Sequence, residues 1–183
     1  MTSSNLHAAS SSYASPGVGG AQAPSGSWVE EIPFELLHLE LVQRALGSAP
    51  GSSRERALAD LELLGFNAGF RLIEKLTKES PKFKDELDLM KFVCKEFWVG
   101  VFRKQIDNLR TNHQGVYVLQ DNQFKFLAKV SQGAQHLEHA PKFVVFTCGL
   151  LRGSLANLGV NSVVTAEVTH LPSVKFQIQV QRA

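Results

Sequence analysis

The side chains in this sequence that could take part in catalysis or bind a metal are two cysteines and a few histidines. Cys148 could act as a nucleophile if His113 lay beside it, because a thiol needs a neighbouring base to form the thiolate. His136 and His139 would share a helix face, as a pair of metal ligands does. However, the sequence has no further ligand at a zinc spacing, no phosphate-binding loop and no nucleophile-elbow motif. We therefore predict surface histidines, an inert buried thiol, and no catalytic, metal or cofactor site.

A single arginine interrupts the most apolar stretch of the chain, Lys142–Gly159. This stretch is shorter than the ~20 residues of a membrane span, so we expect a central core helix. Arg152 within it predicts a structural ion pair, because an unpaired buried charge is costly; a contact with a partner protein is the alternative. Gly149 and Gly153 have the spacing of a close helix contact, which we assign to packing of this helix on its sheet. The candidate partners of the arginine are Glu40, Glu62 and Asp88.

Length and composition favour one soluble globular domain. The chain has 183 residues, of which 44% are hydrophobic and 20% are charged, as is common for a domain with a single core. A net charge of +2 is too small to indicate a nucleic-acid partner. Both cysteines lie in apolar helical patterns, so we expect reduced thiols and a cytoplasmic location.

Residues 1–29 differ from the rest of the chain. They are rich in Ser, Ala, Gly and Pro and carry no charged side chain. They also lack the basic start and apolar run of a secretory signal. We therefore expect residues 1–29 to be a disordered tail and residues 30–183 to form a single folded domain.

Three helices are expected in the first part of the folded region. The first covers Phe34–Leu46, directly after a proline that would open it. The third, Phe83–Ile106, shows the most regular 3.6-residue repeat of apolar side chains in the chain. Between them, Arg54–Leu76 has a helical pattern with two internal glycines. Because glycine is unfavourable in a helix interior, we expect a break or cap near Gly65, and a close approach of another backbone at Gly69.

Two β-hairpins are expected in the second part. Val116–Gln120 and Gln123–Leu127 flank a two-residue turn, Asp121–Asn122, whose side chains tolerate positive φ. Val163–Val168 and Val174–Val180 form the second pair, and the latter alternates apolar and polar residues. The order ααα-ββ-α-ββ predicts a two-layer α+β fold with helices on one face of a four-stranded antiparallel sheet.

The first two helices carry more apolar side chains than one sheet can cover. Apolar positions occupy more than one face of the first helix, and a large exposed patch of this kind usually marks a partner site. We predict a dimer interface near or above the ~1,600 Å² of total area that is typical of stable complexes. The alternative is a lipid or small-molecule carrier with an apolar pocket between helices and sheet. The predicted interface residues are Phe34, Leu37, Leu41, Leu58, Leu61 and Leu64.

Four segments resemble the small α/β subunits of the transport protein particle, TRAPP, and are most similar to the subunit-six group. The resemblance runs from about Ile32 to Val180, and the part that resembles subunit six specifically is NLRTNHQGVYVLQDN. The four segments are LGFNAGFRLIEKL, DELDLMKFVCKEFW, QIDNLRTNHQGVYVLQDNQF and APKFVVFTCGLLRGSLANLG.

The resemblance implies a non-catalytic scaffold subunit of a vesicle-tethering complex. Such a subunit pairs through its first two helices with a subunit-three-like protein, and it contacts further TRAPP subunits. The complex promotes nucleotide exchange on a Rab one/Ypt-type GTPase in transport from the endoplasmic reticulum to the Golgi. The resemblance thus implies a cytoplasmic protein, peripheral at cis-Golgi and endoplasmic reticulum membranes, which it reaches through the complex.

Two further expectations depend on this resemblance. Arg110, Asn112 and His113 lie in the segment most typical of subunit six, so we expect them to contact a partner. Subunit three carries an acylated cysteine at the position that aligns with Ser80. Because a serine cannot form the thioester, we do not expect acylation here.

Overall fold

The computed structural model describes residues 28–47, 51–78, 82–112, 114–128 and 134–182. Our expectation of a disordered tail therefore falls mostly outside the described residues. Helix α4 continues from α3 through a π-helical segment, Val93–Phe97. The helices are α1 (Trp28–Gly47), α2 (Ser52–Thr77), α3 (Glu86–Phe92), α4 (Trp98–Phe102), α5 (Lys125–Ala128) and α6 (Ala134–Asn157). The strands are β1 (Asn108–Thr111), β2 (Val116–Asp121), β3 (Ser162–His170) and β4 (Ser173–Val180).

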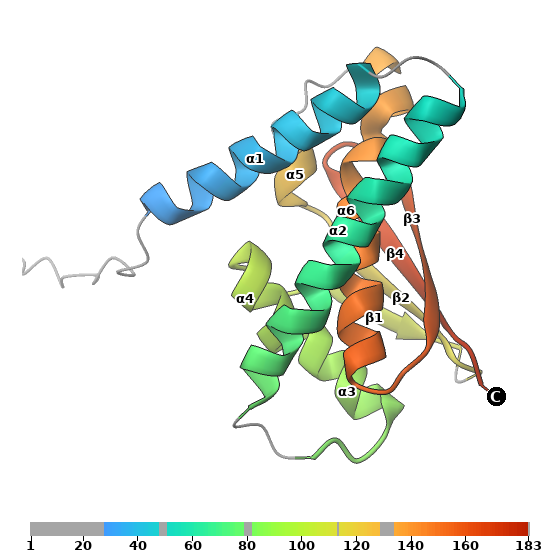
Figure 1. The fold of residues 1–183 in the computed structure, drawn as a ribbon. Coiled ribbons are helices and arrows are strands. Elements are labelled where there is room, and N and C mark those ends of the chain that lie inside the picture. The colour runs from blue at the N-terminus through green and yellow to red at the C-terminus, as the bar shows by residue number, and fades with distance from the viewer. Residues whose placement is uncertain (1–27, 48–50, 79–81, 113, 129–133, 183) are drawn as a thin grey trace, which may run out of the picture.

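The four strands form one antiparallel sheet in the order β1-β2-β4-β3, with the helices gathered in front of it in Figure 1. Along β4, Val174, Phe176 and Ile178 are buried, whereas Gln177 and Gln179 are exposed. This alternation gives the sheet one face toward the core and one toward solvent. The predicted α+β fold with a four-stranded antiparallel sheet is confirmed, and so is the β3–β4 hairpin.

Helix α6 is the centre of the core, as its apolar sequence predicts. It contacts α2 on one side and β3 on the other. The helix begins at Ala134, so Pro141 lies inside it rather than in its first turn. Its buried side chains include Phe143, Val144, Phe146, Leu150, Leu151 and Leu155.

Glycines bring α2 and α6 into backbone contact. A Cβ atom added at Gly69 would overlap the carbonyl of Leu150, and one added at Gly153 would overlap the carbonyl of Phe66. The expected backbone approach at Gly69 is confirmed. The expected break near Gly65 is wrong, because α2 is continuous and this glycine also faces the α6 backbone. The assignment of the α6 glycines to the sheet is wrong as well, because they face α2.

The first hairpin differs from the prediction. β2 pairs with β1, a segment for which we predicted no strand, and residues 123–127 are not a strand. Phe126 and Leu127 are adjacent and both buried, which the alternating faces of a strand do not allow and the short helix α5 does. Phe124, just before α5, is buried as well. Asp121, also fully buried, ends the strand by accepting hydrogen bonds from the Trp98 indole and the Gln123 amide, both at 3.0 Å.

Two helical regions also differ from the prediction at their boundaries. α1 begins at Trp28, so Pro33 lies within the helix instead of opening it. Proline has no amide hydrogen to donate to the carbonyl four residues earlier in the helix. Because Pro33 is exposed, water can hydrogen-bond that carbonyl instead. The third helical region starts later than predicted, after Asp85, whose side chain accepts a hydrogen bond from the Asp88 amide as an N-cap. It ends at Arg103, which adopts a left-handed conformation with φ of 60°.

Replacing Gly153 by alanine tests the α2–α6 contact. The added methyl group would force the helix backbones apart, and such overpacking typically costs ~1–3 kcal/mol of unfolding free energy. We expect urea denaturation of the purified chain to show a loss of this size. Gly47→Ala is the matched control, because no atom lies within 4 Å of the added methyl group there. Equal unfolding free energies for Gly153→Ala and the parent chain would contradict the contact.

Candidate interaction surface on helices α1 and α2

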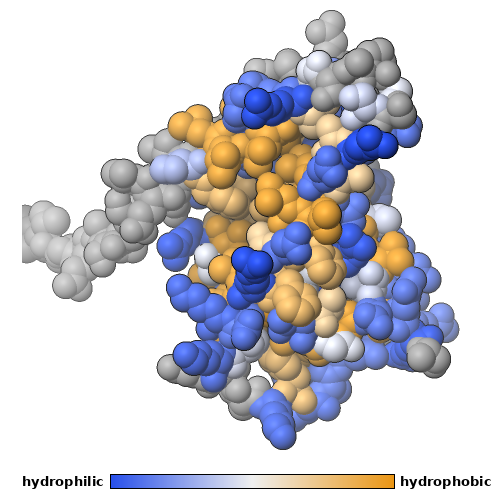
Figure 2. Space-filling view, viewed as in Figure 1, coloured by the Kyte–Doolittle hydropathy of each residue, from blue (hydrophilic) through white to orange (hydrophobic). Residues whose placement is uncertain are grey.

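Helices α1 and α2 present apolar side chains to solvent. In Figure 1 the two helices meet near the connecting residues 48–50 and diverge from there. Figure 2 shows hydrophobic residues gathered over both helices in the same view. Leu37 of α1 is 59% exposed and Leu64 of α2 is 46% exposed. Other exposed apolar side chains on these helices are Leu36, Leu39, Leu63 and Phe70.

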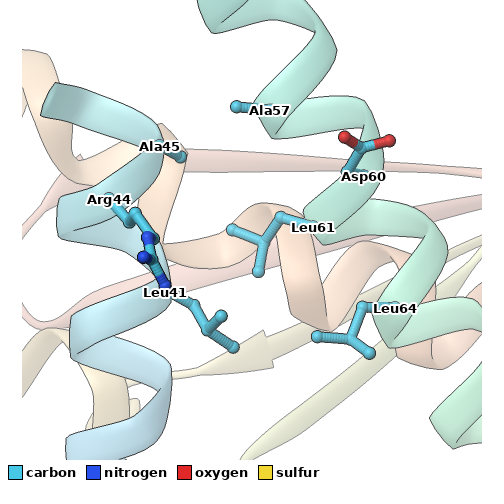
Figure 3. Close-up of a pocket in the computed structure, with 7 residues that line it drawn as sticks. All are labelled: Leu41, Arg44, Ala45, Ala57, Asp60, Leu61 and Leu64. Atoms are coloured by element: carbon cyan, nitrogen blue, oxygen red, sulfur yellow. The ribbon is translucent and has the colours of Figure 1, made fainter. Parts of the chain in front are cut away.

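A groove of about 330 Å³ separates the facing sides of α1 and α2. In Figure 3, Leu41 points from α1 and Leu61 and Leu64 point from α2 into the space between the helices. Arg44 and Asp60 add one side chain of each charge to the lining. The groove therefore combines an apolar floor with charged positions at its edge, as protein interfaces commonly do.

The six predicted interface residues differ in their exposure. Leu37 and Leu64 are exposed, whereas Leu41 and Leu58 are half-buried. Leu61 is only 5% exposed and belongs to the core of this chain. The remaining residue, Phe34, is half-buried, and its ring packs against those of two buried phenylalanines of α5 and α6.

The exposed leucines that the six do not include are Leu36, Leu39 and Leu63. The sequence did contain a signal for the first two, because Leu36 and Leu39 form a second apolar set on α1. The structure separates that set from the α1–α2 groove: both residues line another hollow, together with residues of α5.

Of the residues predicted to contact a partner in the subunit-six-like segment, Arg110 lies on β1 and Asn112 directly after that strand, and neither is on α1 or α2. Arg110 is exposed on β1 and lines a groove of about 410 Å³ across the polar face of the sheet. The side-chain oxygen of Asn112 accepts hydrogen bonds from the backbone amides of Gln114 and Val116, at 2.9 and 3.1 Å, so it shapes the β1–β2 turn. His113 lies outside the described residues.

The two cysteines are unsuited to nucleophilic chemistry. Cys94 and Cys148 are buried free thiols, as predicted. Burial raises the pKa of each thiol to about 12, so neither forms a thiolate near neutral pH. Among the described residues there is no group of three side chains that could ligate a metal ion. His139 is exposed, and the side chain of His136 is not among those described.

Arg152 forms a structural ion pair that links α6 to α2, as predicted. One terminal guanidinium nitrogen lies 3.0 Å from a carboxylate oxygen of Glu62, which selects one of the three candidate partners. The guanidinium carbon lies 5.0 Å from the centre of the Phe66 ring. Both charged side chains are more than one-third exposed, so solvent weakens the pair and its contribution to stability is small.

His38 is the one buried histidine among the described residues, and sequence reasoning did not single it out. It lies on the inner side of α1 and stacks on Phe126, with ring centres 3.6 Å apart and planes 6° from parallel. Burial lowers its pKa from 6.5 to about 4, although a hydrogen bond to the Phe143 backbone acts in the opposite direction. The ring is therefore neutral at neutral pH.

Comparison with known proteins identifies the family. The family model described as Transport protein particle (TRAPP) component matches residues 34–181. The chain belongs to the TRAPP family. Trafficking protein particle complex subunit 6b of Danio rerio is 56% identical over 154 residues, which cover 84% of this chain and 98% of the relative. Subunit 6B of Homo sapiens is 56% identical over 155 residues, with the same coverage of both chains.

Other relatives agree with this assignment. Subunit 6A of Homo sapiens is 49% identical over 157 residues, which cover 84% of this chain and 99% of the relative. A crystal structure of TRAPP subunit 3 from Naegleria fowleri, covalently bound to palmitic acid, matches the fold with a TM-score of 0.68. It is 15% identical, with 84% of this chain and 96% of that chain covered, so the likeness concerns the fold alone. The chain is thus a TRAPP complex subunit in vesicle transport, with other TRAPP subunits as partners.

The described part of this TRAPP subunit contains no helix that is both long and apolar enough to cross a membrane. Helix α6 has the length, but it carries Arg152 and polar residues and packs between α2 and the sheet. Its apolar character therefore serves the core of the domain.

The lowered pKa of His38 predicts a specific pH dependence of stability. The pKa of His38 is 6.5 in the unfolded chain and about 4 in the folded chain. The unfolded chain therefore binds a proton more readily, so acid favours unfolding. The stability that the neutral ring contributes is complete above pH 6.5, falls between pH 6.5 and 4, and can change by at most about 3 kcal/mol. We expect His38→Phe to flatten the stability curve between pH 6.5 and 4, measured by urea denaturation. Parallel curves for His38→Phe and the parent would show that this histidine is not the group responsible.

Proposed function

We propose that this protein is a non-catalytic scaffold that pairs through α1 and α2 with a subunit-three-like TRAPP protein. In this proposal the assembled complex promotes nucleotide exchange on a Rab one/Ypt-type GTPase during transport from the endoplasmic reticulum to the Golgi. The protein works in the cytoplasm, peripheral at cis-Golgi and endoplasmic reticulum membranes, and reaches them through the complex. The interface is centred on Leu37 and Leu64 and includes Phe34, Leu41, Leu58 and Leu61 as supporting residues.

The observation that carries this proposal is the exposure of leucines on both helices beside an apolar groove. Leu37 and Leu64 are each about half exposed, although full burial of a leucine contributes ~1.5–3 kcal/mol. Burial against a partner would recover roughly half of that amount per residue. Because subunits that match this chain over most of its length belong to a multi-subunit complex, another TRAPP subunit is the natural partner.

The packing of the interior supports the scaffold over the alternative of a lipid carrier. Between α4 and the sheet, the Trp98 ring lies 4.5 Å from Phe102 and 5.5 Å from Phe176, measured between ring centres. Phe124 lies 5.3 Å from Phe102 and 5.6 Å from Phe176 in the same cluster. These aromatic rings occupy the interior between α4 and the sheet, where a carrier with a pocket between helices and sheet would need space.

The second predicted contact region, Arg110, Asn112 and His113, is proposed as a contact with a further TRAPP subunit. Arg110 supports this because it is exposed beside the groove on the polar face of the sheet. Asn112 has a supporting role through the turn that it shapes. We propose no acylation of the kind that links palmitic acid to the Naegleria subunit 3, because Ser80, which aligns with the acylated cysteine of subunit three, has no thiol.

A double substitution of exposed leucines tests the pairing. Leu37→Asp/Leu64→Asp places two carboxylates in the proposed interface, where they would have to be desolvated without a partner charge. We expect at least a hundredfold loss of affinity for the purified subunit-three-like protein, measured by isothermal titration calorimetry. The fold should persist, because both positions are exposed in the single chain.

Val163→Asp is the matched control, because Val163 is 44% exposed but lies on β3, away from the two helices. This variant should bind with parental affinity. Circular dichroism of all variants separates loss of binding from loss of fold. If the double variant remains folded and binds as tightly as the control, the proposed interface is wrong.

A further inference from the structure

The outer edge of β3 is the longer of the two edges of the sheet. Among the described strands β3 pairs only with β4, and Figure 1 shows it along a rim of the molecule. It has nine residues, whereas β1 at the opposite edge has four. Proteins commonly protect long edge strands with lysine or proline, and β3 contains neither. An irregularity between Glu167 and His170 limits its regular part to Ser162–Glu167.

The hydrogen-bond pattern of the sheet shows which backbone groups of β3 point outward. The amide of Gln181 donates to the carbonyl of Asn161, the residue just before β3, at 2.8 Å. Because bonded and non-bonded residue pairs alternate along an antiparallel ladder, Ser162, Val164 and Ala166 do not bond to β4. Their amides and carbonyls therefore point away from the sheet, and they have no backbone partner among the described residues.

The inward side chains at this edge are incompletely covered. Val164 and Ala166 pack against the core, but both are only half-buried. Their register partners on β4, Ile178 and Phe176, are both 0% exposed. Because α6 and β4 already contact β3, the uncovered side of Val164 and Ala166 faces the free edge. A further strand would cover that side with its own inward side chains, which should therefore be apolar.

The solvent side of the edge carries one negative charge. Glu167 is exposed, and its neighbour across the ladder on β4 is Lys175. A strand added at the edge would place one of its residues on the other flank of Glu167. Opposite charges on neighbouring strands contribute roughly 0.2–1 kcal/mol, whereas like charges repel each other. The residue of the added strand beside Glu167 should therefore be basic.

We propose that the β3 edge, Ser162–Glu167, docks an extended segment of a protein that the assembled complex recruits. The segment adds to the sheet as an antiparallel strand, because antiparallel pairing is slightly the more stable kind. It has apolar side chains opposite Val164 and Ala166 and a lysine or arginine opposite Glu167. β3 contributes no residue to the α1–α2 groove, so docking here does not compete with the proposed pairing and does not depend on it.

Amide exchange measured by NMR on the purified full-length chain tests whether this edge is open. The amides of Val164 and Ala166 should exchange at least a hundredfold faster than those of Val163 and Thr165, which bond to β4. Slow exchange of Val164 and Ala166 in the chain alone would show that the edge is already occupied. A second copy or another part of this chain would then be the occupant, and the proposal would be overturned.

A designed peptide tests strand addition itself. The probe is the capped peptide Thr-Lys-Val-Thr-Val-Thr-Ser, whose lysine lies opposite Glu167 and whose valines lie opposite Ala166 and Val164 in the antiparallel arrangement. At millimolar concentration it should bind saturably and slow exchange of the Val164 and Ala166 amides. Methylating the backbone nitrogen of the first valine removes a donor to β3 and should weaken binding at least tenfold. The same methylation at the central threonine, whose amide points away from β3, is the matched control and should leave the affinity unchanged. No binding of the probe, or equal affinities of the two methylated peptides, would overturn the proposal.

Substitutions in the chain give a second test of the same edge. Ala166→Pro removes an outward-pointing amide without removing a bond to β4, and proline is tolerated on edge strands in this orientation. The variant should fold and bind the probe at least tenfold more weakly, whereas Ala166→Val, which keeps the amide, should bind like the parent. Glu167→Gln should weaken binding by up to about fivefold. Parental affinity of a folded Ala166→Pro variant would overturn the docking site, and the methylated peptides decide the question if this variant does not fold.

Discussion

The contact between the backbones of α2 and α6 is the constraint on which the rest of the structure depends. Two glycines on each helix allow the carbonyls of one to approach the Cα atoms of the other, and any larger residue would separate them. α6 is thereby held against both α2 and the sheet. Because α2 is fixed by this contact along one side, its opposite side and the adjoining α1 are not covered by any further layer of the described residues.

The exposed leucines follow from this arrangement. Leu61 reaches the core beside α1, whereas Leu64, three residues later, is left at the edge of the groove. Helix α1 contacts α2 on one flank and α5 on the other, so it presents apolar residues on two sides. The described part of the chain thus buries a core and leaves apolar side chains exposed on both flanks of α1.

Sequence patterns predicted the helices and strands in which buried residues recur at a regular spacing. They missed the features that depend on contacts between residues far apart in the sequence. The alternation in β4 and the apolar run of α6 identified both elements. From the sequence alone, Gly65 predicted a helix break, because glycine is unfavourable in a helix interior. Its contact with the α6 backbone, which the sequence does not show, explains why a glycine is needed there. Residues 123–127 have strand-forming side chains, but the neighbouring side chains of Phe126 and Leu127 both enter the core, and the chain forms the short helix α5 there. In the candidate site, Leu37 on α1 and Leu61 on α2 each belong to an apolar helical repeat. The sequence therefore does not distinguish them, and only the placement of α1 against α2 leaves Leu37 exposed and Leu61 buried.

Hydrogen–deuterium exchange on the chain alone and in the assembled TRAPP complex tests the central claim most directly. The claim is that association covers the exposed apolar faces of α1 and α2, and burial of helix faces slows the local opening through which amides exchange. The account predicts that assembly slows exchange along Trp28–Gly47 and Ser52–Thr77 and leaves the β3–β4 hairpin unchanged. Slower exchange confined to the sheet, with both helices unaffected, would contradict it.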